Sequence, residues 1–193
     1  AIAGKRQAQA LNTPAEGEQP FISVLVPAYN EEKAIRAKIE NCLNQRYPMD
    51  KVEFLFGSDG STDGTNSILS EFVDKANVRA FFLPRSGKSA VIRHLLSKAK
   101  GDIVVLSDAT SMWGEETLDV FSACFRDSNV GAVGVIPEFV DREGNAKNGA
   151  YERLERLIKS AESSIGCVVG LSGSVYAIRR SIIDDIPSNV IND

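Results

Sequence analysis

The stretch FISVLVPAYNEE, from Phe21 to Glu32, decides how the chain begins to fold. Its first six residues are rich in β-branched side chains and end at Pro27, which fixes its own φ and donates no backbone hydrogen bond. They predict a buried strand. Apolar residues then recur at helical spacing, which predicts an amphipathic helix over residues 31–45 carrying Ile35, Ile39, Cys42 and Leu43. The first unit of the fold is therefore a strand followed by a helix.

The same alternation continues along the chain. Apolar runs at residues 52–56, 78–83 and 102–106 predict three more strands, and helical patterns follow the first two of these runs. Because parallel strands need crossover connections, this alternation predicts an α/β fold with a mainly parallel central sheet and helices on both faces. Ligands of such sheets bind outside the carboxyl ends of the strands, so the segments that follow the strands are the candidate sites.

The pattern changes beyond Glu115. The sequence there predicts a helix carrying Leu118, Phe121 and Phe125, a strand at residues 131–136, and a further helix carrying Leu154, Leu157, Ile158 and Ala161. A glycine-rich segment that becomes strand-like follows at residues 166–180. We expect this half of the chain to shape a second pocket.

Composition limits the possible functions. The 193 residues suffice for one domain with a sizeable core, and the net charge of -4 offers no broad basic surface for a nucleic acid. The three cysteines form no CxxC pair, which argues against a disulfide framework or a zinc site and favours a reducing compartment. No apolar run approaches the ~18 residues of a membrane helix, so these residues are expected to be soluble by themselves.

The ends of the chain carry their own predictions. Residues 1–20 are rich in Ala, Gln, Gly and Pro without a sustained period, which predicts a linker or disordered arm. The chain starts at Ala1 without a methionine and stops at IPSNVIND without a closing element, which predicts a piece excised from a longer protein.

Two polar loops follow the first two strands. In PAYNEE the acids suit a helix N-terminus, where the helix dipole favours negative charge, and equally a ligand site. In GSDGSTDGT, Ser61 or Thr62 is positioned to cap the next helix. Capping accounts less well for Asp59, which lies immediately past the strand, where a carboxylate would accept hydrogen bonds from a base or ribose. Both interpretations stay open at this point.

The loop RSGKSA, residues 85–90, follows the third strand and contains Gly-Lys-Ser. A phosphate-binding loop of the Walker type needs another glycine five places before Gly87, and that position is Phe82. Arg85 and Lys88 at a helix N-terminus would still make a seat for a diphosphate, and a solvated basic turn is the alternative.

Asp108 follows the fourth strand, in SDAT. A carboxylate at the exit of a buried strand is costly unless it caps a helix, meets a cation or faces solvent. Magnesium binds through only one or two protein carboxylates, so one acid suffices if the substrate brings a diphosphate, with Thr110 completing the site. The alternative is an N-cap for the helix near Glu115, which lies far downstream.

Five segments in this order, ISVLVPAYNEE, SDGSTDGT, RSGKSA, SDAT and GLSGSVYAIRR, resemble the family 2 glycosyltransferases of the GT-A fold, in their bacterial polysaccharide-synthase-like branch. The resemblance covers residues 21–193. It implies a nucleotide-sugar donor, in the first place a UDP-sugar, and a divalent cation, Mg²⁺ or Mn²⁺, held by Asp108 and Thr110. It assigns nucleotide binding to Pro27, Ala28, Tyr29, Glu31, Asp59, Lys88 and Asp108.

The resemblance also divides the chain into a nucleotide-binding half, residues 21–113, and an acceptor-binding half, residues 114–193. In the second half it places the acceptor, a saccharide or lipid-linked saccharide, against Gly170, Ser172, Gly173 and Arg179; a bulged strand is the alternative for the glycines. The family's catalytic base is the second acid of an acid-Asp pair. Asp193 aligns with the first acid and is the catalytic candidate within the chain, and the base itself would follow it. On this alignment the polypeptide is expected to bind donor and fail at transfer.

The resemblance further implies inversion at the transferred sugar, synthesis of cell-surface polysaccharide, and a parent protein attached to the cytoplasmic side of the bacterial inner membrane. Three positions depart from the family: Ser58 and Thr110 stand where acids are common, and Arg93 stands where an asparagine is frequent. These departures keep a non-catalytic nucleotide-sugar-binding or regulatory module as an alternative. A sugar nucleotidyltransferase is a second alternative, although PAYNEE lacks the glycine-rich signature typical of that class.

Overall fold

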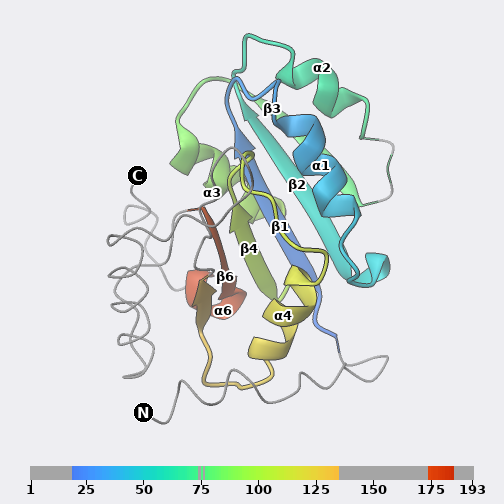
Figure 1. Cartoon of the computed structure of the whole chain (residues 1–193). Helices are drawn as coiled ribbons and strands as arrows, with labels where there is room; N and C mark the ends of the chain where they lie inside the picture. Colours follow the sequence, from blue (N-terminus) through green and yellow to red (C-terminus); the bar gives the residue numbers. More distant parts are fainter. Residues whose placement is uncertain (1–18, 74, 76, 135–173, 185–193) are drawn as a thin grey trace, which may run out of the picture. The chain divides into compact units, whose positions relative to one another are not determined.

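A six-stranded sheet forms the centre of the part of the protein that the computed structural model describes, namely residues 19–73, 75, 77–134 and 174–184. The strand order is β3-β2-β1-β4-β6-β5 (Figure 1). The strands are β1 (Ile22–Ala28), β2 (Val52–Asp59), β3 (Val78–Leu83), β4 (Ile103–Ser107), β5 (Ala132–Gly134) and β6 (Val175–Arg179). The first four strands pair in parallel, and β6 runs antiparallel to β4. The predicted mainly parallel sheet is confirmed.

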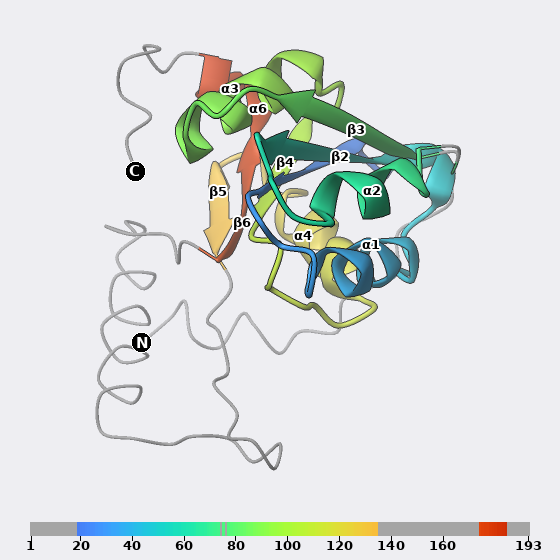
Figure 2. The same ribbon diagram turned by 90° about the horizontal axis from the view of Figure 1, so that it is seen from above.

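Helices cover both faces of this sheet, as the alternating pattern predicts. Figure 2 shows α3 and α6 on one face and α1, α2 and α4 on the other. The helices are α1 (Ile35–Leu43), the short 3₁₀ helix η2 (Met49–Lys51), α2 (Thr65–Ser70), α3 (Lys88–Lys98), α4 (Thr117–Cys124) and α6 (Arg180–Asp184). The described residues, Gly134 excepted, belong to one compact unit. Within them, no helix combines the length and the apolar character that a membrane span requires.

The core explains why the strands read as continuous apolar runs. Leu25 of β1 and Leu55 of β2 are in register and fully buried, and both pack against Val91 and Leu95 of α3. On the other side of the strands, residues such as Phe54 are also fully buried. Because a strand covered on both faces needs apolar side chains at every position, strict alternation is lost.

Gly101, which precedes β4, lies where the backbone of β4 comes close to the backbone of β1. A Cβ atom at this position would lie 2.5 Å from the backbone nitrogen of Ser23 and 2.8 Å from the carbonyl oxygen of Ile103. The Gly101 amide also donates a 2.8 Å hydrogen bond to the Ser23 hydroxyl, which in turn donates 2.6 Å to the buried Glu53 carboxylate. A side chain here would push β4 away from β1.

We therefore expect Gly101→Ala to lower the free energy of unfolding by about 2 kcal/mol, because the clash is with backbone that cannot relax. Urea unfolding followed by circular dichroism measures this. Gly114→Ala is the matched control, since its nearest atom would be 3.9 Å from the new Cβ and no clash follows. Equal stability of the two variants would contradict the expectation.

Two details of the prediction are wrong, for one reason. Helix α1 begins at Ile35 rather than Glu31, and the N-cap of α2 is Gly64, which provides no side-chain cap, rather than Ser61 or Thr62. The Ser61 hydroxyl instead accepts the backbone N–H of Asn30 at 3.1 Å, and the amide of Thr62 donates to the Asn30 side chain at 2.8 Å. Contacts between the two loops replace the local caps that the sequence predicts.

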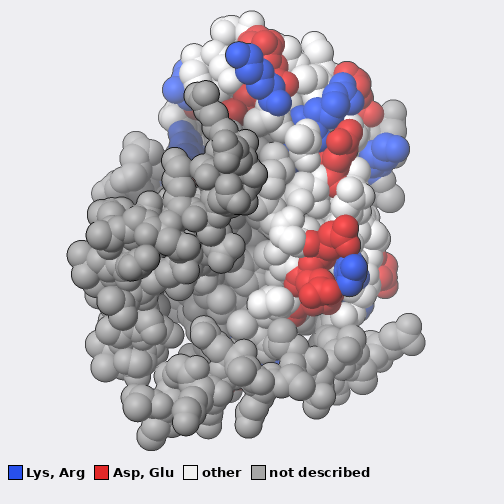
Figure 3. Space-filling view, in the orientation of Figure 1, with Lys and Arg blue, Asp and Glu red and all other residues white. Residues whose placement is uncertain are grey.

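Charged side chains are interspersed over the face formed by α1, α2 and α4 (Figure 3). Two exposed ion pairs belong to these elements and their flanks, Arg36–Glu71 at 2.6 Å and Arg46–Glu116 at 2.7 Å. Exposed pairs of this kind contribute less than about 1 kcal/mol each. Residues 1–18 of the arm predicted at residues 1–20, the rest of the strand at 131–136, and the helix carrying Leu154 lie outside the described residues.

Candidate functional site

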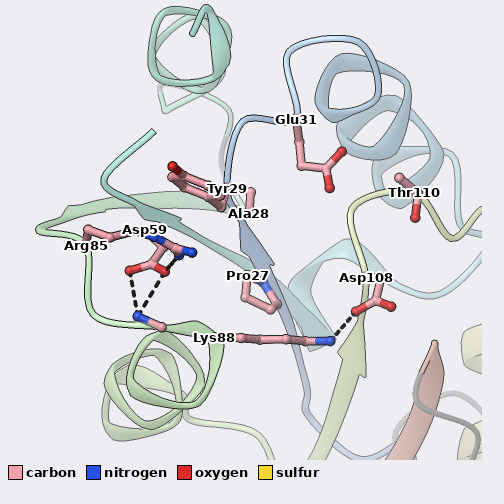
Figure 4. Close-up of a pocket in the computed structure, with 10 residues that line it drawn as sticks. Pro27, Ala28, Tyr29, Glu31, Asp59, Arg85, Lys88, Asp108 and Thr110 are labelled. Carbon is pink, nitrogen blue, oxygen red and sulfur yellow. Dashed lines mark hydrogen bonds and ion pairs between the residues drawn. The ribbon is translucent and has the colours of Figure 1, made fainter. Parts of the chain in front are cut away.

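A cavity of about 490 Å³ lies at the carboxyl ends of β1, β2 and β4. Its lining comprises Pro27, Ala28, Tyr29, Glu31, Asp59, Arg85, Gly87, Lys88, Asp108 and Thr110 (Figure 4). All seven residues predicted to bind the nucleotide are among them, together with Thr110. They come from four separate segments at the carboxyl ends of β1 to β4, which meet because parallel strands end at the same edge of a sheet.

Asp59 ends β2 with its carboxylate turned toward the loop between β3 and α3. The residue is only 2% exposed, and it accepts the amide of Ser86 at 2.6 Å, the amide of Gly87 at 3.0 Å and the guanidinium of Arg85. Burial alone would raise the pKa of Asp59, but these donors hold it below its ordinary value. The carboxylate oxygens that were predicted to accept hydrogen bonds from a base or ribose thus accept them from the chain's own amides and guanidinium.

Arg85 and Tyr29 form a flat surface in the cavity wall. The Arg85 guanidinium lies 3.7 Å from the centroid of the Tyr29 ring, and Tyr29 is 42% exposed (Figure 4). Stacked guanidinium and aromatic groups offer planar faces that suit a nucleobase. Sequence reasoning nominated Arg85, with Lys88, as a seat for a diphosphate and did not predict its contact with Tyr29. Its distance from Asp59 in the sequence left no local signal of their ion pair.

Lys88 reaches into the cavity from the first position of α3. The preceding Gly87 has φ of 92°, a conformation that favours glycine, so that the amino end of the helix faces the cavity. The Lys88 ammonium donates to Oδ1 of Asp108 at 2.8 Å, with its side chain passing Pro27 (Figure 4). Both side chains remain partly exposed, at 51% and 36%. A helix amino end with an adjacent lysine is suited to hold an anion.

The segment after β4 places Asp108 and Thr110 in the cavity wall. Ala109 between them is 2% exposed, so the chain presents its first and third residues to the cavity and buries the second. The Asp108 amide donates to the carbonyl of Ser174, which precedes β6, at 3.0 Å. The capping alternative for Asp108 is excluded, because α4 has Glu116 as its N-cap and no side-chain cap.

Asn30 locks the first polar loop to the second. It has a positive φ of 54° and makes the two contacts to Ser61 and Thr62 described above. The amide of Glu31 donates to the Thr65 hydroxyl at 2.8 Å, which fixes the Glu31 backbone while its carboxylate points into the cavity (Figure 4). The sequence did not predict the role of Asn30, because that role is visible only in the contact between the two loops.

Ser58, which stands where an acid is common in the family, does not line the cavity. Its side chain is fully buried and donates to the Ser61 hydroxyl at 2.8 Å. An acid at this position would add a second buried carboxylate next to Asp59, at a large desolvation cost.

Arg179 lies at the other end of the sheet from the cavity. It pairs with Ile103 at the start of β4, and its guanidinium donates to the carbonyls of Phe125 at 3.0 Å and Asp127 at 3.2 Å. The antiparallel direction of β6 carries the residue away from Asp108, so the predicted contact with an acceptor gains no support from this position. Gly170, Ser172, Gly173 and Asp193 lie outside the described residues.

The oxygen ligands at Asp108 and Thr110 are too few to hold a divalent cation alone, so a substrate would have to supply further ligands. Among the described residues no group of three or more His, Cys, Asp or Glu is arranged to hold a metal ion. The cavity instead provides the Asp108 carboxylate and the Thr110 hydroxyl. Such hard oxygen ligands suit Mg²⁺ or Mn²⁺, which commonly complete their coordination with phosphate oxygens and water.

Comparisons with known proteins identify the family and the fold. A β-monoglucosyldiacylglycerol synthase from Nostoc sp. is 30% identical over 176 residues, which cover 88% of this chain and 38% of that protein. The chain thus spans less than half the length of this curated relative. Among solved structures, a mannosyltransferase from Pyrobaculum calidifontis, in complex with GDP-Man and Mn²⁺, has a TM-score of 0.77 and 26% identity, covering 97% of this chain and 54% of that one.

A second solved structure shares the fold. It is Staphylococcus aureus TarS 1-349 in complex with UDP-GlcNAc, with a TM-score of 0.62 and 23% identity, covering 86% of this chain and 47% of that one. These neighbours and the sheet order identify the α/β architecture as that of the GT-A glycosyltransferases. Residues 23–186 match the family described as Glycosyl transferase family 2. The chain therefore belongs to glycosyl transferase family 2.

Proposed function

We propose that this glycosyltransferase takes a nucleoside diphosphate sugar into the cavity at the carboxyl end of its sheet and transfers the sugar to a saccharide acceptor. One observation carries the proposal. Eight residues that the sequence nominates for the donor and its metal, taken from the carboxyl ends of four strands and the segments that follow them, line one cavity. The division into a nucleotide-binding half, residues 21–113, and an acceptor-binding half, residues 114–193, belongs to the same proposal.

The nucleoside would lie against Tyr29 and Arg85, and the diphosphate against Lys88 and the amino end of α3. Stacking accounts for the first contact and charge for the second. The related mannosyltransferase binds GDP-Man and TarS binds UDP-GlcNAc, so both bases occur among proteins with this fold. We retain the UDP-sugar that the sequence resemblance implies as the donor to be tested first.

The charges in the cavity favour entry of the diphosphate together with a divalent cation. Arg85 is paired with Asp59 and Lys88 with Asp108, while no hydrogen bond or ion pair involves the Glu31 carboxylate within the described residues. A diphosphate alone would meet a lining with more acids than bases. Asp108 and Thr110 would hold Mg²⁺ or Mn²⁺, and the bound ion would offset the negative charge that develops on the leaving diphosphate.

The transfer itself would be a single displacement with inversion. The acceptor hydroxyl attacks the anomeric carbon, the bond from that carbon to the diphosphate oxygen breaks, and the hydroxyl proton passes to a carboxylate base. Lys88 stabilises the departing diphosphate. The base belongs to the acid pair at which Asp193 aligns, and Gly170, Ser172 and Gly173 remain the candidates for acceptor contact. A role in cell-surface polysaccharide synthesis at the cytoplasmic face of the inner membrane completes the proposal.

Calorimetry with UDP-sugars and GDP-sugars, with and without Mn²⁺, tests the donor site. We expect one class of donor to bind more tightly in the presence of Mn²⁺, because the ion and the diphosphate enter as a neutral pair. Absence of binding for every donor, with and without metal, would contradict the proposal. A parallel incubation with a sugar 1-phosphate and a nucleoside triphosphate should release no pyrophosphate; release would identify a nucleotidyltransferase instead.

Donor turnover is measured separately from donor binding. Release of UDP or GDP in the presence of an acceptor supports a transferase. Metal-dependent binding without release from the full-length parent protein would favour the alternative of a non-catalytic nucleotide-sugar-binding module.

A further inference from the structure

One side of α1 holds the loop that carries Asp108 and Thr110. Lys38 and Asn41 are three residues apart and lie along the same side of the helix, and Gln45 follows two residues after the helix ends at Leu43. Each of them bonds to backbone atoms of residues 111–114. The Lys38 ammonium donates to the Ser111 carbonyl at 2.5 Å, and the Gln45 amide donates to the Gly114 carbonyl at 3.0 Å.

Asn41 makes the central contact of this row. Its amide nitrogen donates to the Trp113 carbonyl at 2.8 Å, and its side-chain oxygen accepts the Trp113 backbone N–H at 3.1 Å. The indole N–H of Trp113 donates in turn to the hydroxyl of Ser107, the last residue of β4, at 3.1 Å. The loop is thus fixed at Ser107, before Asp108, and at residues 111–114, after Thr110.

Lys38 is the most unusual member of the row, because it is a fully buried lysine. Its relative exposure is 0%, and its ammonium lies 3.7 Å from the centroid of the Trp113 ring. Burial lowers the pKa of Lys38 from 10.5 to about 8, with Cys42 and Asp108 acting in the opposite direction. A methionine would fill this space without the cost of burying a charge, so packing alone does not account for a lysine here.

The contacts of Lys38 lead directly to Asp108. The Ser111 residue whose carbonyl accepts from Lys38 donates its own amide to the Asp108 carbonyl at 3.2 Å. On the cavity side, Lys88 bonds to the Asp108 carboxylate. Asp108 therefore lies between a lysine that contacts its side chain and a lysine that anchors the turn behind it.

We propose that Lys38 is a positioning residue for the diphosphate end of the cavity: it anchors the 108–113 loop so that Asp108 and Thr110 face the diphosphate and its divalent ion. The inference rests on the proposed function, because that function assigns the ligand of Asp108. Lys38 itself is not among the residues that line the cavity.

Trp113 is the only tryptophan in the chain, so its fluorescence reports on this loop. In Lys38→Met we expect stronger quenching of this emission by acrylamide without any ligand. We also expect about tenfold weaker binding of UDP or GDP in the presence of Mn²⁺, as loss of one charge-assisted hydrogen bond predicts. Affinity for free uridine or guanosine should stay unchanged, because a nucleoside has no diphosphate. Lys33→Met, at an exposed position before α1, is the matched control.

Asn41→Ala provides a second variant that removes two loop contacts and leaves the charge of Lys38 in place. It should shift quenching and diphosphate affinity in the same direction, and it decides the question if Lys38→Met does not fold. The inference is overturned if both variants bind UDP or GDP with Mn²⁺ as tightly as the wild type, or if they lose nucleoside and diphosphate affinity in equal proportion. Failure of the wild type to bind either nucleotide would instead contradict the proposed function. In that case the anchoring role of Lys38 is still tested without ligand, and unchanged quenching of Trp113 in the variants would disprove it.

Discussion

Replacing Asp108 with asparagine is expected to slow sugar transfer by about a hundredfold to a thousandfold. This is the usual cost of removing one group that stabilises charge in a transition state. Asparagine keeps the size of the side chain but removes its negative charge. The variant would therefore hold a divalent cation weakly, and the charge developing on the diphosphate would lose its main counterpart. Release of UDP or GDP, measured with an acceptor at saturating Mn²⁺ and donor on a form of the protein that includes the residue after Asp193, gives the rate.

The folded structure should tolerate this change. The Lys88–Asp108 ion pair is partly exposed, so its loss should alter the free energy of unfolding by less than about 1 kcal/mol. Asp102→Asn is the matched control, because Asp102 is an exposed acid just before the opposite end of the same strand. If Asp108→Asn turns over as fast as this control, the assignment of the metal ion to Asp108 is contradicted.

Asp59→Asn is expected to lower the free energy of unfolding by about 3 kcal/mol, because it leaves buried amide donors and the Arg85 guanidinium poorly paired. The amides of Ser86 and Gly87 both donate to this carboxylate. Loss of these bonds should also release Arg85 from Tyr29 and weaken nucleotide binding. Urea unfolding and calorimetry measure the two effects, with the exposed Asp50→Asn as control.

The pH dependence of this difference has a definite sign. The pKa of Asp59 is lowered in the folded state, by hydrogen bonds that outweigh its burial, so below the ordinary value of 3.8 the unfolded chain binds the proton more readily. The stability that the carboxylate provides is present above this pH and is lost as the pH falls through the lower, folded-state value. The difference between wild type and Asp59→Asn should therefore shrink in acid. A constant difference between pH 7 and pH 3 would show that the carboxylate charge does not act in this way.

Much of the candidate site follows from the sequence because the fold is periodic. Apolar runs alternating with helical patterns place each polar loop after a strand, and parallel strands bring those loops to one edge. Periodicity nominated these loops as the candidate site, and the resemblance to the family 2 glycosyltransferases assigned the individual residues from Pro27 to Thr110. The helix start at residue 31 and the caps at Ser61 and Thr62 were wrong because a loop contact with Asn30 competes with local capping, and propensity contains no information on such contacts.

Arg179 and Asp59 show where prediction from the sequence stops. The segment around Arg179 was recognised, but the reversed direction of β6 determines which end of the sheet the residue occupies. Asp59 was nominated as a group that binds the donor, yet its hydrogen bonds go to a loop 26 to 28 residues further along the chain. Neither partner is visible in the local pattern.

By itself, the sequence of this glycosyltransferase determined the alternation of strands and helices, the mainly parallel sheet and the loops that form its cavity. Each of these follows from hydrophobic periodicity over neighbouring residues. Only the tertiary structure decided which charges pair, that Asp59 accepts hydrogen bonds from the loop of Arg85, and that Lys38 is buried against the ring of Trp113. Such partners are distant in sequence, and the free energy of a buried charge depends on the groups that surround it in space.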